Sequence, residues 1–314
     1  MQKIYFCNLL GAVAIKVCFS RYVSDLRVSS NCVQSDCSVD HFKTLAVTTP
    51  KPFVFQVELN RPDKMNAMNR TLWTEIKECF ERLSINPDCR AIVLSAAGKH
   101  YTAGIDLMDM MKLGQQLAQI EDVGRKGLTL ERTIKLYQDC ISSLEICPKP
   151  VIAAVHSACV GAGVNLITAA DIRHCTQDAW FQVTEVHIGM AADVGALQRL
   201  PKVIANQSIA RELCFTGRKF YSDEAKEIGL VTKVFPDKDS LLAESIDLAE
   251  KIAELSPIAV QATKKNMVYS LDHTNQEGLD QIREMNKMFL QSEDFANAVG
   301  AQITKTEKPQ FSKL

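Results

Sequence analysis

Two carboxylates and a glycine-rich turn lie close together between residues 151 and 195. The turn is Gly161-Ala162-Gly163, and the acids are Glu185 and Asp193, the second of which is set in an apolar stretch. Small residues leave backbone N–H groups accessible, and such groups can stabilise a negative charge that develops on an oxygen atom. Carboxylates beside them can accept and donate protons. The combination indicates an enzyme that acts next to a carbonyl group.

A second small-residue turn, Thr102-Ala103-Gly104, follows another buried strand. Taken alone, either turn is more typical of a tight connection between a strand and a helix. In the same way, Asp106 is more typical of a helix cap than of a ligand. Taken together, the two turns can present two backbone N–H groups to the same oxygen atom. Each turn therefore has both a structural and a catalytic interpretation.

The two acids differ in how readily a structural role explains them. Glu185 on its own is typical of a solvated acid in a loop. Asp193 lies in MAADVGAL, which offers it no charged partner nearby in the sequence. A carboxylate in apolar surroundings has a raised pKa, and a proton donor requires that property. Asp193 is therefore harder to explain without a catalytic role.

Strands alternating with helices are predicted around these residues. Apolar runs predict strands over residues 53–59, 90–95, 151–155, 171–176 and 180–183. Helical spacing of apolar residues predicts helices from residue 69 onward, over 128–144 and over 164–170, whereas the polar segment 114–127 predicts a mobile loop or a loosely packed helix. Beyond Leu197 the pattern is almost wholly helical, and one helix starts at Ser256-Pro257, a serine cap followed by proline. This order indicates an α/β domain followed by a helical part.

Composition narrows the functional class. The chain has 314 residues, of which 46% are hydrophobic and 23% charged, and a formal net charge of −1. These values are ordinary for a globular protein, and the charge gives no argument for binding nucleic acid or an anionic membrane. No segment approaches the roughly 20 uninterrupted apolar residues of a spanning helix. The eleven cysteines show no CxxC spacing, which favours reduced thiols in an intracellular protein.

Both ends of the sequence resemble targeting signals. Ser312-Lys313-Leu314 forms a peroxisomal tripeptide, which an import receptor reads at an exposed C-terminus. Residues 1–24 carry three basic residues and no acid, which fits a mitochondrial presequence better than a secretory signal. An unstructured extension without an address fits them equally well. The sequence thus predicts a peroxisomal protein, with the mitochondrion as an alternative destination.

These patterns divide the chain into four parts. We expect a targeting or disordered extension over residues 1–45 and an α/β core over residues 46–250. A helical region over 251–304 and a flexible tail over 305–314, which carries the tripeptide, are expected to follow.

Three segments resemble the enoyl-CoA hydratase/isomerase (crotonase) family: LNRPDKMNAMN, HYTAGIDLMDM and HSACVGAGVNLITAADIRHC. The resemblance runs from about Phe53 to Phe289. It implies a crotonase-type spiral of ββα units with a helical C-terminal oligomerisation region, and a homohexamer built as a dimer of trimers. It also implies an acyl-CoA thioester substrate and no cofactor or metal, since coenzyme A is part of the substrate.

The resemblance further implies which residues bind the substrate. In the family two backbone N–H groups hold the thioester oxygen, and by motif position these belong to Ala103 and Ala162. Ala162 stands where the family usually has the middle glycine of a GGG turn, but the donor is a backbone group that alanine can supply. The other implied substrate-binding residues are Gly104, Ile105, Asp106 and Leu107.

A longer run, FQVTEVHIGMAADVGALQRLPKVI, and the terminal FSKL are similar to the dienoyl-CoA isomerases of the family. These members convert 3,5-dienoyl-CoA to 2,4-dienoyl-CoA in the β-oxidation of unsaturated fatty acids. By this likeness Glu185 is the base that removes the C2 proton, and Asp193 is the acid that protonates C6. The alternatives are an enoyl-CoA isomerase that returns the proton to C4 with Glu185 alone, and a catalytically weak acyl-CoA-binding member.

Asn165 departs from the family pattern. The family places an acid twenty positions before the glutamate, where this chain has asparagine. Asparagine keeps the shape and a hydrogen-bond acceptor but cannot exchange a proton. Hydration of a double bond uses both family acids, so Asn165 argues against a hydratase and leaves isomerisation open. His187 also replaces an acid common in the dienoyl-CoA isomerases, and we interpret it as a surface or subunit-contact histidine.

Overall fold

The computed structural model describes residues 41–305 and 309–314. Its strands are β1 (Leu45–Lys51), β2 (Val54–Leu59), β3 (Ala91–Ala96), β4 (Val151–Val155), β5 (Ala158–Val160), β6 (Ile172–Thr176), β7 (Trp180–Gln182), β8 (Phe220–Tyr221) and β9 (Lys233–Phe235). Its α-helices are α2 (Arg70–Ile85), α3 (Leu107–Ala118), α4 (Val123–Ile146), α5 (Ala162–Thr168), α6 (Ala196–Val203), α7 (Gln207–Thr216), α8 (Ser222–Glu227), α9 (Lys238–Ala253), α10 (Pro257–Tyr269), α11 (Asn275–Phe289) and α12 (Glu293–Thr304). Two short 3-10 helices cover Pro62–Lys64 and Glu185–Ile188.

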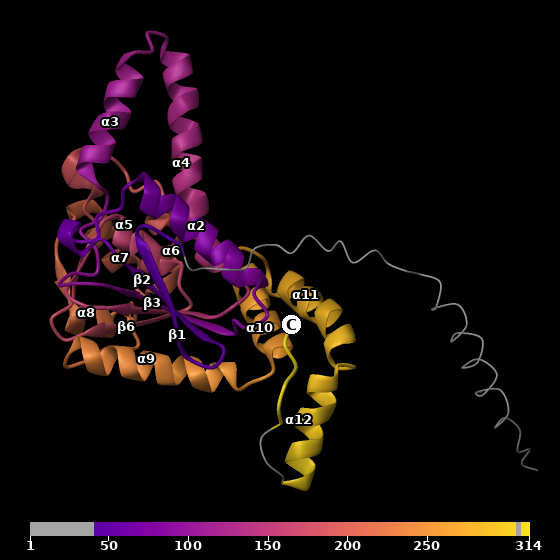
Figure 1. The fold of residues 1–314 in the computed structure, drawn as a ribbon. Coiled ribbons are helices and arrows are strands. Elements are labelled where there is room, and N and C mark those ends of the chain that lie inside the picture. The colour runs from indigo at the N-terminus through magenta and orange to yellow at the C-terminus, as the bar shows by residue number, and fades with distance from the viewer. Residues whose placement is uncertain (1–40, 306–308) are drawn as a thin grey trace, which may run out of the picture. The chain divides into compact units, whose positions relative to one another are not determined.

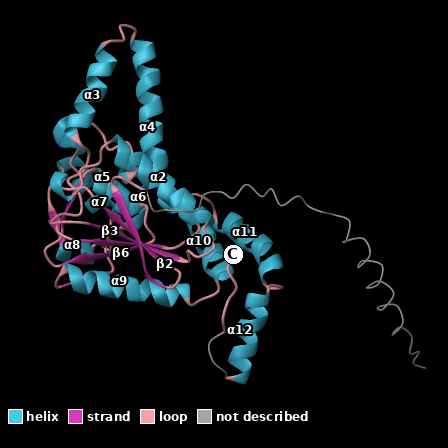
Figure 2. Ribbon diagram, in the orientation of Figure 1, coloured by secondary structure: helices cyan, strands magenta, loops and turns pink. Residues whose placement is uncertain are grey.

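The larger of two sheets contains six strands in the order β1-β2-β3-β4-β6-β9. The pairing of β1 with β2 is antiparallel, and all other pairings in this sheet are parallel. Every residue of β3 and β4 is buried, as expected for parallel strands that are covered on both faces. Figure 2 shows these strands surrounded by helices. A smaller sheet joins β5, β7 and β8.

Successive residues of the central strands enter two different cores because side chains alternate across a sheet. Val93 packs with Leu241 of α9, which runs along one face of the sheet (Figure 1). Ile92 and Leu94 point the other way, into the larger core that also holds Phe80 of α2. The sheet is therefore held between α9 and the layer that contains α2 and α5.

Several elements begin where the sequence predicted. The Asn69 side chain caps α2 by accepting a hydrogen bond from the Leu72 N–H at 3.0 Å. Ser256 caps α10 by accepting from the Ala259 N–H, and Pro257 is the first helical residue. These contacts satisfy N–H groups that have no partner inside the helix.

The structure differs from the expected elements in three places. Strand β1 was not predicted, because it lies at the edge of the sheet and its middle and end are polar. The short strands β5, β8 and β9 were not predicted either, because two or three residues are too few for a periodic pattern. The segment 114–127 contains the end of α3, the connecting residues 119–122 and the start of α4, and the two helices extend from the sheets as neighbours (Figure 1). No residue of α3 is buried, so a loosely packed helix is confirmed for the part of the segment that α3 covers.

The remaining sequence expectations concern the ends and the cysteines. Of the extension expected over residues 1–45, residues 1–40 lie outside the described residues. Residues 306–308 of the expected tail also lie outside them. The described tail contacts the core, because Arg90 donates hydrogen bonds to the carbonyls of Phe311 and Ser312. In the described part of the chain, seven cysteines are free and buried: Cys79, Cys89, Cys140, Cys147, Cys159, Cys175 and Cys214.

Candidate active site

A cavity of about 570 Å³ lies between the two small-residue turns and the inner sides of α3 and α4. Glu185 and Asp193 both line this cavity, and both come from the connection between β7 and α6. The expected substrate-binding residues that line it are Ala103, Ile105, Asp106, Leu107 and Ala162. Gly104 is not among the lining residues. The structure thus brings both acids and both turns to one space.

Gly104 allows the two turns to approach each other. Its φ is +88°, and a Cβ atom there would lie 2.8 Å from the Val160 carbonyl oxygen and 3.7 Å from the Ala162 nitrogen. A positive φ and such close contact exclude other residues without strain. Gly104 therefore acts through the backbone geometry instead of facing the cavity.

Ile105 and Ala162 carry backbone donors that are free to bind an oxygen atom in the cavity. The N–H of Ala103 already donates to the Met65 carbonyl at 2.9 Å, which corrects the assignment of a donor role to Ala103. Among the described residues, the N–H groups of Ile105 and Ala162 have no hydrogen-bond partner. Ala162 is the first residue of α5, where a helix leaves its N–H groups unpaired. The free N–H groups of Ile105 and Ala162 therefore border the cavity, with Ile105 in place of Ala103.

Glu185 begins a short 3-10 helix and is half-buried. Its Oε1 accepts a hydrogen bond from the Asn165 Nδ2 at 2.9 Å. Its Oε2 is buried and has no partner in the described part of the chain. Burial raises the pKa of Glu185, the hydrogen bonds from its own N–H and from Asn165 oppose that rise, and the nearby charge of Asp193 adds to it. Glu185 thus has one oxygen held by Asn165 and one without a hydrogen-bond partner among the described residues.

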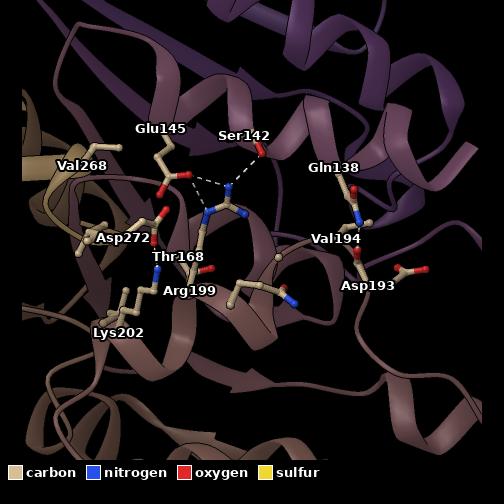
Figure 3. Close-up of a pocket in the computed structure, with 14 residues that line it drawn as sticks. Gln138, Ser142, Glu145, Thr168, Asp193, Val194, Arg199, Lys202, Val268 and Asp272 are labelled. Atoms are coloured by element: carbon tan, nitrogen blue, oxygen red, sulfur yellow. Dashed lines mark hydrogen bonds and ion pairs between the residues drawn. The ribbon is translucent and has the colours of Figure 1, made fainter. Parts of the chain in front are cut away.

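Asp193 is half-buried in the loop before α6, where Gln138 of α4 donates a hydrogen bond to its carbonyl at 2.7 Å. Burial raises the pKa of its carboxyl group. Arg199 and Lys202 lie on the neighbouring helix, but Figure 3 shows the Asp193 carboxylate pointing away from them.

The two cationic side chains of α6 form ion pairs with acids other than Asp193. Arg199 pairs with Glu145 at 2.7 Å, and Lys202 pairs with Asp272. Within residues 41–305 and 309–314, Asp193 has no ion-pair partner. The spatial arrangement therefore agrees with the unpaired acid that the sequence predicted.

Two other polar residues have structural roles. The Asp106 side chain caps α3 by accepting from the Met108 N–H at 3.1 Å, and it also pairs with Arg61 at 3.2 Å. The cap interpretation of Asp106 is confirmed, although the residue also borders the cavity. His187 is exposed, and its Nε2 lies 2.9 Å from the Thr216 carbonyl oxygen. It is a satisfied surface histidine, as expected.

The apolar walls of the cavity were not predicted as part of the site. They are formed by residues of α3 and α4, among them Met110, Leu113, Leu130, Ile134 and Tyr137. The spacing of Met110 and Leu113, and of Leu130 and Ile134, places each pair on one side of its helix. That spacing was visible in the sequence, but it does not show which side faces a ligand.

The described residues set limits on other kinds of site. Within them, no group of three or more His, Cys, Asp or Glu side chains is arranged to hold a metal ion. No helix among them has the length and apolar character needed to cross a membrane.

Comparison with known proteins identifies the class of protein. Residues 51–313 match the enoyl-CoA hydratase/isomerase family, and the chain belongs to that family. The enoyl-CoA hydratase from Bacillus anthracis has a similar solved structure, with a TM-score of 0.77 and 27% identity over 86% of this chain and 99% of that one. The expected family and its α/β fold are therefore confirmed.

Relatives within the family are more similar still. The chain is 48% identical to the mitochondrial Δ3,5-Δ2,4-dienoyl-CoA isomerase of Rattus norvegicus, over 93% of this chain and 89% of the relative. It is 41% identical to the peroxisomal Δ3,5-Δ2,4-dienoyl-CoA isomerase of Arabidopsis thaliana, over 88% of this chain and all of the relative.

Proposed function

We propose that this protein converts 3,5-dienoyl-CoA to 2,4-dienoyl-CoA in the β-oxidation of unsaturated fatty acids. The observation that carries the proposal is the presence of two carboxylates, Glu185 and Asp193, beside one apolar cavity that also has free backbone donors. The similarity to dienoyl-CoA isomerases from animals and plants supports the same reaction.

The reaction begins with the loss of a proton from C2. Glu185 accepts this proton, and the electron pair left behind spreads over the thioester oxygen and over carbons as far as C6. The N–H groups of Ile105 and Ala162 are the proposed partners of the thioester oxygen, which carries much of the new charge. An oxyanion donor of this kind contributes about 3–4 kcal/mol to lowering the barrier.

The reaction ends with protonation at C6. Asp193 donates this proton, so that the double bonds move to the 2 and 4 positions and no atom is gained or lost. Burial raises the pKa of Asp193, which favours the protonated form that the step needs. Glu185 then holds the proton from C2, and one proton must return to Asp193 before the next turnover. The proposed chemistry uses no cofactor beyond the coenzyme A of the substrate.

Three thioesters test this proposal. Purified protein is given a 3,5-dienoyl-CoA, a 3-enoyl-CoA and a 2-enoyl-CoA, and the conjugated product is followed by absorbance. We expect turnover of the dienoyl substrate and no hydration of the 2-enoyl substrate. Turnover of the 3-enoyl substrate alone would contradict the proposed reaction, and binding without any turnover would indicate an acyl-CoA-binding protein.

We also propose a homohexamer and peroxisomal delivery. Exposed apolar side chains on α11 and α12 support assembly through the C-terminal helices. The exposed Ser312, Lys313 and Leu314 support recognition by the peroxisomal import receptor. The mitochondrion is the second proposed destination, because the rat relative is named mitochondrial whereas the Arabidopsis relative is named peroxisomal. A fluorescent protein fused to the N-terminus leaves the C-terminal tripeptide exposed and tests that signal. A fluorescent protein fused to the C-terminus tests the N-terminal segment.

A further inference from the structure

Asn165 of α5 connects the segments that carry the two acids. Its side chain is fully buried. Its Nδ2 donates hydrogen bonds to Glu185 Oε1 at 2.9 Å and to the Gly161 carbonyl oxygen at 3.1 Å. Its Oδ1 accepts from the Ala196 N–H at 2.5 Å. Ala196 is the first residue of α6 and follows Asp193 by three positions.

One orientation of the Asn165 amide satisfies all three contacts. The Ala196 N–H can only donate, so it must face the amide oxygen, whereas the other two partners accept and must face the amide nitrogen. An ionised aspartate could accept from Ala196 but would place an oxygen against two other acceptors. A leucine would leave a buried N–H unpaired, at a cost of about 1–3 kcal/mol. The surroundings of residue 165 therefore favour asparagine over the acid that the family has there.

The Asn165 amide also determines whether Glu185 can share a proton with residue 165. An acid at position 165 would share a proton with Glu185, and two adjacent carboxylates push one pKa strongly upward. The Asn165 amide gives Glu185 a hydrogen bond without a proton that can be exchanged. Oε2 of Glu185 is the oxygen left for a substrate proton.

We propose that Asn165 is a positioning residue that sets the separation of Glu185 from Asp193 and keeps Glu185 an anionic base for a single proton. The inference rests on the proposed function and assigns a role to the position where this chain departs from its family. In place of an acid that takes part in proton exchange, the protein has an amide that fixes both carboxylate-bearing segments.

Few other ionisable groups face Glu185. Asp193 is one, and its charge raises the pKa of Glu185. Cys214 of α7 is another; burial raises its pKa, and the charge of Glu185 adds to the rise. His187 lies on the same 3-10 helix but is directed to the Thr216 carbonyl. After substitution of Asn165, a change in the pKa of Glu185 can therefore be attributed to residue 165 once the effects of these few neighbouring groups are taken into account.

The variant Asn165→Asp tests the proposal. Infrared difference spectra against Glu185→Gln report the ionisation of Glu185 over a pH series and need no substrate. We expect the Glu185 titration to move upward by at least about one pH unit, and the acid limb of kcat/KM to move with it. The rate at a pH below the limb should then fall about tenfold. Asn266→Asp on α10 is the matched control, because Asn266 also donates to a carbonyl but lies outside the cavity.

A second variant covers the case in which the first does not fold. Asn165→Ser is smaller and polar, and its side chain is too short to hold Glu185 and Ala196 together. We expect kcat to fall at least tenfold, KM to change little, and the Glu185 titration to move upward in the same direction. A Glu185 titration that stays at its wild-type position in the folded variant would overturn the proposal. If wild-type protein does not turn over the dienoyl substrate, the proposed function fails, while the spectra still test the role of Asn165.

Discussion

At the scale of single residues, the two carboxylates have separable tasks. Asp193→Asn removes the proton donor for C6 but leaves Glu185 and the free N–H groups of the cavity in place. We expect dienoyl turnover to fall at least about 100-fold, the usual contribution of an acid catalyst, while exchange of the C2 proton with deuterated water continues. Absorbance measures the first quantity and proton NMR the second. Asp239→Asn, an exposed change in the first turn of α9, is the control, and dienoyl turnover that survives Asp193→Asn would rule out its role as the acid.

The pH dependence follows from the same two residues. Activity requires ionised Glu185, so it is lost as the pH falls through the pKa of Glu185. It requires protonated Asp193, so it is also lost as the pH rises through the pKa of Asp193. Burial raises both pKa values, so both limbs of the kcat/KM profile should lie above the ordinary carboxyl range of about 3.9–4.3. In Asp193→Glu the basic limb should persist, and a wild-type profile without a basic limb would contradict the scheme.

Some features of single site residues could be predicted from the sequence and others could not. The motif gave Glu185, Asp193 and both turns, because their types and spacing are visible in the chain. It did not show that the N–H of Ala103 is consumed by the carbonyl of Met65, which is a contact between distant positions. Likewise, Asn165 was recognised as a departure, but its bond to the Ala196 N–H depends on how α5 and α6 pack.

At the scale of elements, the connection through Gly104 keeps the two donor turns together. Gly104→Ala places a methyl group 2.8 Å from the Val160 carbonyl oxygen at a φ of +88°. We expect a loss of about 1–3 kcal/mol in the free energy of unfolding and a fall in kcat, because the N–H groups of Ile105 and Ala162 move apart. Urea denaturation and the dienoyl assay measure the two effects. Gly114→Ala on α3 meets no atom within 4 Å, so it should stabilise the helix by up to about 1 kcal/mol.

The elements themselves were largely predictable where periodicity was long or capping was clear. The buried strand Val151–Val155 and the start of α10 at Ser256 were predicted from local sequence. The edge strand β1 and the short strands β8 and β9 were not, because their pairing partners, and not their own patterns, define them.

The Gly104→Ala variant also has an outcome that would contradict its prediction. If its activity equals that of wild type, the close approach of Gly104 to the Val160 carbonyl is not needed for the reaction.

At the scale of the whole molecule, the C-terminal helices α11 and α12 expose apolar side chains of the kind found at subunit interfaces. Phe295, Val299 and Ile303 follow one another at intervals of four residues along α12, so they share one face, and all three are exposed. Leu279 and Met288 of α11 are also exposed. Exposed apolar side chains gathered on one helix face mark an interface more often than scattered ones do. This argument supports assembly and leaves the number of subunits to measurement.

A charge on this face of α12 should prevent assembly. In the double variant Phe295→Asp, Val299→Asp, two carboxylates would have to be buried without partners, which is strongly unfavourable. Light scattering should therefore give a smaller particle than the hexamer expected of the wild-type chain, with the helical circular dichroism signal largely retained. Glu244→Lys, a charge change on the exposed side of α9, should leave the particle mass unchanged. If the double variant keeps the wild-type mass, the subunits meet through another surface and the exposed face of α12 needs a different explanation.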